Sequence, residues 1–312
     1  MIKQDFDFSK KKVIQRKLCI LCESKNLDLV IDFGKTPLAN SYPKKLTEIE
    51  NYFKLRILLC KSCGHAQLKD IVDPKLMFEN YLYVSGTSKV LVNHFENLAK
   101  KIIKKFRLKK NDKIVDIACN DGTLLNFFVK KNFNNVIGID PAKNLRKLNI
   151  DKKIDINTIF FTKKSSMLIK KKYGKFKLIT ANNVCAHIPD LNDFFDGVKN
   201  VLSKDGIFVF EVSYLLDVIN KLYFDTIYHE HMSYHAIKPL IIFLNKKGLQ
   251  LFDFDLIPVQ GGSIRVYVSH INAKKVNFKK INRQVLIEKK NKLFSQNKYK
   301  KYYSKIQNQK KN

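Results

Sequence analysis

The sequence VDIACNDGTLL (residues 115–125) links an apolar strand to a helix through a short polar turn. The apolar run over 113–119 is rich in β-branched side chains, which is typical of a strand buried on both faces. Gly122 permits a tight turn before the helix. A second apolar run follows and ends in Asp140. A glycine turn after one strand and an acid after the next are typical of a crossover that binds a nucleotide.

Alternation of strands and helices continues from this crossover to about residue 270. Further strand-like runs cover 175–183, 206–214, 249–259 and 263–270, and Asp190 stands where it can cap a helix. This order predicts an α/β fold with a doubly wound, mostly parallel sheet. In such a fold, ligands bind at the carboxyl ends of the strands.

The turn lacks the G-x-G-x-x-G pattern that brings backbone amides close to the pyrophosphate of NAD. Ala118 and Asn120 stand where glycines would fall. A cofactor without a pyrophosphate needs only a carboxylate for its ribose hydroxyls, which Asp140 offers, and polar groups near an amino-acid moiety, such as Asp116 and Asn120. The pattern therefore favours S-adenosylmethionine over NAD. A turn that only caps a helix is the remaining alternative.

Four of the six cysteines form two C-x2-C pairs, Cys19 with Cys22 and Cys60 with Cys63. Two such pairs match a tetrahedral zinc site of four thiolates, and the chain between them can hold a small sheet. The alternatives are a dithiol redox pair or buried free thiols, and His65 is a weaker candidate ligand. A closed zinc site is structural, so the pattern predicts a small N-terminal zinc-binding domain and does not indicate an activity.

The net charge is +31, yet Arg fills only six of the 59 basic positions. Because phosphate and base recognition favour the Arg guanidinium, the charge indicates mainly a solvated Lys surface, and a nucleic-acid partner is unfavoured. No apolar run approaches the ~18–20 residues of a membrane span, and the N-terminus has no apolar signal segment. We therefore expect a cytoplasmic protein with reduced cysteines and no membrane partner.

Several motifs, taken in order, resemble the sugar C-methyltransferases that act on nucleotide-linked 4-keto-deoxyhexoses. They lie between about residues 19 and 270, and each is only modestly specific, whereas the ordered set is highly specific. Gln260, before the last motif, departs from the His expected there. The motifs are the two C-x2-C pairs, DFGKTPLAN (32–40), YLYVS (81–85), VDIACNDGTLL (115–125), ANNVCAHI (181–188), DTIYHEH (225–231) and GGSIRVY (261–267).

The resemblance implies a seven-stranded, Rossmann-like methyltransferase sheet and C-methylation next to the keto group of a nucleotide-linked deoxy sugar. Such chemistry needs a base that removes a proton beside the ketone, a group that orients the base and a donor for the enolate oxygen. By resemblance His231 is the base, and a neighbouring carboxylate such as Glu230 can raise its basicity. The other residues expected at this site are Tyr228, His187, and Tyr81 or Tyr83, which would close over the reacting methyl group.

The expected cofactor site follows the same motifs. Asn183 has a second expected role, since with His187 it can contact the substrate or its enolate oxygen. His229 is expected only to anchor the loop. The residues assigned to S-adenosylmethionine are Asp116, Cys119, Asn120, Asp121, Gly122, Asp140, Asn182 and Asn183.

The expected domains are a zinc-binding domain over 1–85, a methyltransferase domain over 86–270 and a Lys-rich tail over 271–312. The family usually has a third, C-terminal domain that contributes much of the sugar-nucleotide site, and the tail is interpreted as its remnant. The expected partners are a small nucleotide-sugar substrate and a separately encoded C-terminal domain.

Three other functions remain open. The first is an O- or N-methyltransferase of another small metabolite. The second is a zinc-containing nucleic-acid-binding protein or nucleic-acid methyltransferase, although ANNV (181–184) stands where amino-methylating DNA enzymes carry [D/N]-P-P-[Y/F]. The third is an inactive remnant.

Overall fold

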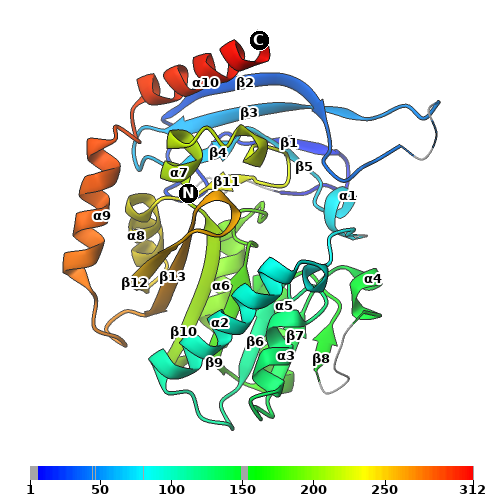
Figure 1. The fold of residues 1–312 in the computed structure, drawn as a ribbon, viewed down its shortest axis with the longest axis vertical. Coiled ribbons are helices and arrows are strands. Elements are labelled where there is room, and N and C mark those ends of the chain that lie inside the picture. The colour runs from blue at the N-terminus through cyan, green and yellow to red at the C-terminus, as the bar shows by residue number, and fades with distance from the viewer. Residues whose placement is uncertain (1–5, 44, 46, 80, 149–153, 312) are drawn as a thin grey trace.

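The computed structural model describes residues 6–43, 45, 47–79, 81–148 and 154–311. Two sheets lie one above the other along the long axis of the molecule (Figure 1). A four-stranded sheet comes mainly from the N-terminal residues, and a seven-stranded sheet comes from the middle of the chain. Among the described residues, no helix has the length and apolar character needed to cross a membrane.

The seven-stranded sheet consists of β6 (Ile114–Ile117), β7 (Val136–Ile139), β8 (Asp155–Asn157), β9 (Phe176–Asn182), β10 (Leu202–Ser213), β12 (Leu249–Ile257) and β13 (Ser263–His270). Its order is β12-β13-β10-β9-β6-β7-β8. Neighbours from β10 to β8 are parallel, whereas β13 is antiparallel to both β10 and β12. The expected α/β fold with a mostly parallel, seven-stranded sheet is therefore confirmed.

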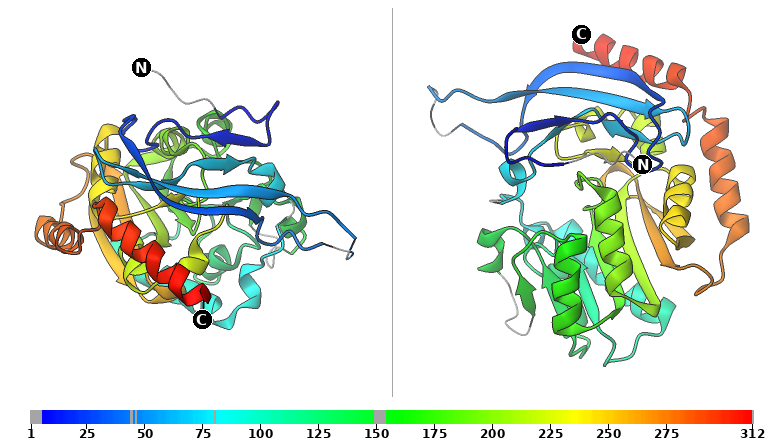
Figure 2. Two further views of the ribbon diagram at one scale, coloured as in Figure 1. Left: turned by 90° about the horizontal axis from the view of Figure 1, so that it is seen from above. Right: turned by 180° about the vertical axis from the view of Figure 1, so that it is seen from behind.

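Helices cover both faces of this sheet (Figures 1 and 2). On one face, α2 (Lys89–Phe106) and α3 (Thr123–Val129) contribute to one buried apolar cluster. On the other face, α5 (Lys163–Tyr173), α6 (Leu191–Val201) and α8 (Ile237–Lys246) contribute to a second cluster. Every residue of β6 and β7 is buried, which explains their continuous apolar runs. The predicted cap of α6 is also confirmed, because Asp190 accepts two backbone hydrogen bonds at its start.

The four-stranded sheet has the order β11-β4-β3-β2 and is antiparallel throughout. Its strands are β2 (Leu27–Pro37), β3 (Tyr52–Cys60), β4 (Ala66–Leu68) and β11 (Ser233–Tyr234). Strand β11 follows the motif DTIYHEH and pairs with β4, at Ser233 with Gln67 and at Tyr234 with Ala66. The N-terminal sheet is therefore completed by a strand that lies far along the sequence. Beside it, β1 (Val13–Gln15) pairs with β5 (Asp70–Val72).

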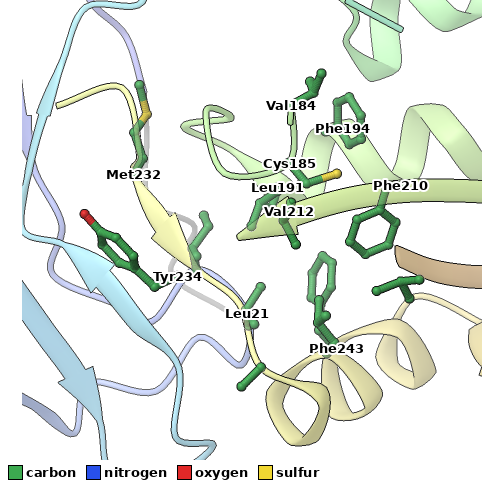
Figure 3. Packing of buried hydrophobic residues seen from close by; sticks show 14 of the residues in the cluster. Leu21, Val184, Cys185, Leu191, Phe194, Phe210, Val212, Met232, Tyr234 and Phe243 are labelled. Atoms are coloured by element: carbon green, nitrogen blue, oxygen red, sulfur yellow. The ribbon is translucent and has the colours of Figure 1, made fainter. Parts of the chain in front are cut away.

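Apolar side chains join the two sheets into a common core. Leu21, between the first two cysteines, belongs to the same buried cluster as Val212 of β10, Met232, Tyr234 and Phe243 of α8 (Figure 3). The two parts of the chain therefore share one interior and do not meet across a solvated boundary.

Two C-terminal helices, α9 (Phe278–Lys290) and α10 (Gln296–Lys311), pack on the body of the molecule. Buried Glu288 of α9 accepts hydrogen bonds from Tyr214 and from the first amide of α8, at 2.8 and 2.7 Å. Helix α10 lies along β2 (Figure 1), and its Tyr303 donates to the carbonyl of Asp32 at 2.6 Å. The tail thus contacts both the seven-stranded and the four-stranded sheet.

Candidate active site and zinc site

The four cysteines of the two pairs form one cluster, with all their sulfur atoms within 4.8 Å of one another. Cys19 Sγ lies 3.6 Å from Cys63 Sγ, and Cys22 Sγ lies 3.5 Å from Cys60 Sγ. Four thiolates around one zinc ion, at ~2.3 Å each, would lie about 3.8 Å apart. The cluster therefore fits a tetrahedral Zn²⁺ with no open position.

Backbone turns hold each pair in this arrangement. The amide of Glu23 donates to the Cys19 carbonyl, and that of Gly64 donates to the Cys60 carbonyl, both at 2.8 Å. Glu23 and Gly64 have left-handed φ angles of 62° and 88°. His65, the weaker candidate ligand, lies outside the cluster, because its buried ring packs against His235.

A cleft of about 810 Å³ lies beyond the carboxyl ends of β6, β7 and β9. Residues from the N-terminal part of the chain and from the seven-stranded sheet both contribute to its walls. Three predicted site residues are not in the wall: Asp121, Gly122 and Glu230. The predicted residues that line it are Tyr81, Tyr83, Asp116, Cys119, Asn120, Asp140, Asn182, Asn183, His187, Tyr228 and His231.

The turn after β6 holds two residues other than glycine in a left-handed conformation. Ala118 and Asn120 both have φ = 55°, a left-handed conformation that glycine adopts with less strain. The carboxylate of Asp140 fixes the turn from β7, because it accepts hydrogen bonds from the amides of Asn120 and Ala142 at 2.8 Å each. These two hydrogen bonds hold the turn after β6 against the end of β7.

Asn120 and Asp121 hold the chain segment that enters from the N-terminal part. Asn120 bonds the carbonyl of Tyr83 and the amide of Ser85, both at 2.9 Å. Asp121 accepts from the amide of Gly86 at 2.8 Å and from Thr123, so it lies behind the cleft. Gly122, with φ = 80°, is the N-cap of α3 and also lies behind the wall. These contacts give the ACNDG turn (residues 118–122) a structural role, because they join residues 83–86 to the seven-stranded sheet.

Burial controls the carboxyl groups at the cofactor end of the cleft. It raises the pKa of Asp116 to about 7, partly opposed by a hydrogen bond from Thr180 at 2.6 Å. It raises the pKa of Asp140 to about 6 against the two backbone hydrogen bonds. Asn182, at the end of β9, has no hydrogen-bond partner for its buried side-chain atoms among the described residues. Two buried acids and an unsatisfied amide fit a polar ligand that carries positive charge and hydroxyl groups, as S-adenosylmethionine does.

A row of contacting rings also lines the cleft and is called the ring wall here; it is formed by Phe78, His187, His231 and Tyr228. The His187 ring stacks on Phe78 with centroids 5.5 Å apart, and it faces His231 at 5.1 Å. Tyr228 covers the other side of His231 at 4.3 Å. These rings come from α1 (Lys75–Phe78), the segment after β9 and the segment after η2 (Phe224–Thr226). The motif DTIYHEH therefore meets the ANNVCAHI motif here.

The orientation of His231 follows from its two hydrogen bonds. Its Nδ1 lies 2.6 Å from the carbonyl of Thr226, which can only accept, so Nδ1 carries the proton. Its Nε2 lies 3.2 Å from the hydroxyl of Tyr228 and is the basic nitrogen of the ring. Burial lowers the pKa of His231 to about 4, opposed by the Thr226 carbonyl. His231 is therefore neutral at pH 7, with its lone pair beside the cleft.

Glu230 differs from the sequence expectation, because its contacts lie away from His231. Its carboxylate accepts from Asn40 at 3.0 Å and from the Tyr81 hydroxyl at 3.2 Å. Residues 228–231 form a turn, closed by a hydrogen bond from the His231 amide to the Tyr228 carbonyl at 3.1 Å, and the Thr226 carbonyl takes the orienting position beside His231. Burial raises the pKa of Glu230. Glu230 thus ties the N-terminal part of the chain to the rim of the cleft.

Some residues of this site carried no signal that the sequence analysis used. Asn40 ends the DFGKTPLAN motif, which could have suggested a role for it, whereas Phe78 ends the short helix α1, which belongs to no motif. Thr226 acts through its backbone carbonyl, which any residue would offer. His229 is buried against Phe53 with both ring nitrogens unpartnered among the described residues, consistent with an anchoring position.

Two family models match the sequence in adjoining segments. Residues 19–78 match a family described as "Putative zinc binding domain". Residues 92–252, more than half of the chain, match a family described as "Methyltransferase domain". The chain belongs to the methyltransferase family. Its cofactor is S-adenosylmethionine, and the cysteine cluster lies within the segment that matches the zinc-binding family.

A curated relative, C-methyltransferase NovU of Streptomyces niveus, is 30% identical over 253 residues. The match covers 80% of this methyltransferase chain and 60% of that relative, so the chain spans well under the relative's full length. The two family models and this relative confirm the resemblance to C-methyltransferases with an N-terminal zinc domain.

Solved structures with some likeness to the chain include two methyltransferases. The magnesium protoporphyrin IX methyltransferase of Synechocystis PCC 6803, with bound S-adenosylhomocysteine, is 11% identical, with a TM-score of 0.45 over 59% of this chain and 88% of that one. A methyltransferase of Anabaena variabilis is 14% identical, with a TM-score of 0.44 over 62% and 97%. The family assignment rests on the sequence models and not on these likenesses.

Proposed function

We propose that this methyltransferase transfers a methyl group to the carbon next to the keto group of a nucleotide-linked deoxy-keto sugar. The observation that carries the proposal is the neutral His231, whose basic Nε2 lies at the same cleft as Asp140 and Asn182. A C-methyltransferase must remove a proton from carbon, and a positioned neutral imidazole can do so. The relative named as a C-methyltransferase supports the same reaction class.

The proposed step begins with proton transfer from the carbon beside the ketone to His231 Nε2. The electron pair of that C–H bond forms the carbon–carbon double bond of the enolate, and the ketone oxygen takes the negative charge. The Thr226 carbonyl stabilises the imidazolium that forms, because it accepts a hydrogen bond from Nδ1–H. S-adenosylmethionine, when bound, supplies an electrophilic methyl group for the nucleophilic carbon.

Two polar groups of the ring wall can donate to the enolate oxygen. The Tyr228 hydroxyl already faces His231 Nε2 at 3.2 Å. His187 Nε2 is buried without a partner among the described residues, and burial together with the neighbouring His231 lowers the pKa of His187 well below its usual value. A neutral His187 can donate a hydrogen bond without adding a second positive charge beside His231.

Hydrogen exchange tests the proton-transfer step separately from methylation. A 4-keto nucleotide sugar is incubated with the protein in deuterated water, without a methyl donor. Wild-type protein should exchange the hydrogen next to the ketone, and His231→Ala should lower that rate about 10²–10⁴-fold. Full exchange in His231→Ala would move the base to Glu230 or His187. An inactive wild type that still binds the sugar would favour an O- or N-methyltransferase.

The domain boundaries and the cellular location are part of the same proposal. We propose a zinc-binding domain over 1–85, a methyltransferase domain over 86–270 and a C-terminal segment over 271–312. The substrate that we propose for the protein is a small nucleotide sugar. A cytoplasmic location, where nucleotide sugars are made, suits this substrate.

A further inference from the structure

We propose that Gln260 contacts the substrate through its side-chain amide and helps to set which oxygen substituent the cleft accepts. This inference deepens the proposed function and rests on it. Gln260 lies in η3 (Val259–Gly261), the short connection between β12 and β13. It lines the cleft together with Asp225, Tyr228 and His231.

The backbone of Gln260 has a left-handed conformation, with φ = 53° and ψ = 46°. Glycine adopts this region at less cost than any residue with a side chain. Gln260 therefore carries its side chain at an energetic disadvantage, and contacts within the protein do not offset it. The side chain is exposed, and its amide has no hydrogen-bond partner among the described residues.

The two residues that follow Gln260 are tightly packed. A Cβ atom at Gly261 would lie 2.6 Å from the Tyr223 ring, and one at Gly262 would lie 2.0 Å from the Asp217 carboxylate. The connection is therefore packed tightly against the chain segment that leads to the ring wall. Gly262 is also bonded on both sides, to Val259 and Tyr214, at 3.1 and 3.0 Å. A fixed loop with one free side chain at the cleft is the arrangement of a positioned contact residue.

The side-chain amide of Gln260 is suited to bind an uncharged oxygen substituent of the substrate. It offers both a donor and an acceptor, so it can bind a hydroxyl or a carbonyl group. Exposed Asp225 already adds negative charge to this part of the wall. A carboxylate at position 260 would therefore repel an anionic substrate, whereas the neutral amide does not.

Steady-state exchange of the 4-keto nucleotide sugar tests the inference with Gln260→Gly and Gln260→Glu. Gln260→Gly removes the strain and the amide together, so its Tm should be unchanged or higher. Its KM should rise about 3–10-fold, as for a lost neutral hydrogen bond, with kcat changed less than about 2-fold. Gln260→Glu should raise KM further. S-adenosylmethionine affinity should be unchanged in both variants.

Asn272→Gly is the matched control, because Asn272 is an exposed amide with φ = 63° outside the cleft wall. It should leave KM and kcat at wild-type values. An unchanged KM in Gln260→Gly, with active wild type, would overturn only the role of Gln260. A wild type that binds the sugar and exchanges no hydrogen would overturn the proposed function, and this inference with it.

Discussion

The molecule contains two pairs of facing histidines that share one chain segment and differ in their surroundings. His231 and His187 face each other at 5.1 Å in the wall of the cleft. His235, four residues further on, faces His65 at 5.6 Å between the two sheets. Burial lowers the pKa of both His231 and His235 to about 4. A strongly shifted pKa therefore does not distinguish the residue with a chemical role from the residue that packs the interior.

Access and orientation do distinguish them. His231 has its basic nitrogen beside an open cleft and its other nitrogen fixed by Thr226. His235 bonds the Cys185 carbonyl through Nε2 at 3.2 Å, and it is 1% exposed. Arg16 closes the region from the side, with hydrogen bonds to the carbonyls of Met232 and Pro189. We call the region around Arg16, His65 and His235 the seam.

The largest expected effect is the loss of stability when the zinc site is disrupted, because this site lies beside the seam and away from the cleft. Protein purified without added zinc should contain one Zn²⁺ per chain, and Cys60→Ser should lower the unfolding free energy by more than about 4 kcal/mol. The backbone of Cys60 bonds that of His65, so the seam should loosen first. Metal analysis and thermal unfolding measure both. Cys185→Ser, a buried cysteine outside the cluster, should keep its zinc; zinc-free wild type that is fully folded would contradict the assignment.

The next effect compares the two histidines directly. His231→Ala should lose about 10²–10⁴-fold in methyl transfer while S-adenosylmethionine affinity stays near wild type. His235→Ala should keep its turnover per folded molecule within about 3-fold, yet lose about 2–4 kcal/mol of stability through the cavity it leaves. Turnover and chemical denaturation are measured on both variants. His231→Ala should show the larger loss of turnover, and His235→Ala should show the larger loss of stability. If the two variants lost activity equally, the contrast between seam and cleft would fail.

A smaller effect concerns pH and the acids of the cleft. In the absence of cofactor, the pKa values of Asp116 and Asp140, about 7 and 6, lie above the unfolded value of 3.8. Their contribution to stability is therefore present at low pH and lost as the pH rises through 6–7. Cofactor affinity should change the other way, because positively charged S-adenosylmethionine favours ionised carboxylates.

Calorimetry from pH 5.5 to 8 checks these opposed trends. Asp140→Ala should weaken cofactor binding by roughly 1.5–3 kcal/mol at pH 8, the scale of a lost charge-assisted hydrogen bond. The difference from wild type should shrink as the pH falls, since the wild-type carboxyl is then protonated. An affinity that is independent of pH in both proteins would remove this acid from the binding site.

The smallest expected effect is at Glu230. Glu230→Gln keeps an acceptor for Asn40 and Tyr81, so turnover should fall less than about 10-fold and the cleft should keep its shape. Rate measurements beside His231→Ala provide the comparison. A loss as large as that of His231→Ala would make the Glu230 carboxylate the base, for which its raised pKa would suit it.

The sequence was sufficient for features that depend on short, local patterns. The two C-x2-C pairs predicted the cysteine cluster because each pair lies on one turn. The buried strands from 113 to 140 predicted the sheet because a strand covered on both faces is apolar throughout. The runs over 249–259 and 263–270 were predicted as strands, and they correspond to β12 and β13, which are antiparallel neighbours.

The geometry around His231 could not be predicted in the same way. Its orienting group is a backbone carbonyl, which leaves no mark in the side-chain sequence. The partners of Glu230 are Asn40 and Tyr81, which lie 190 and 149 residues away in the sequence. The depressed pKa of His231 arises from burial, to which the His187 ring of a distant segment contributes, and the expectation of a base strengthened by Glu230 considered only adjacent residues.

The pairing of β11 with β4 has a consequence for anyone who recombines these proteins. The strand that completes the N-terminal sheet begins two residues after His231. A chimera that exchanges residues 1–85 alone would pair the β4 of one protein with the β11 of another. The loop that carries His231 would then be anchored to a strand with which it did not evolve. The smallest exchangeable unit is therefore discontinuous, and it combines the N-terminal residues with 225–236. The position of the base should be inherited with that unit, because the segment that carries His231 continues directly into the strand that pairs with β4.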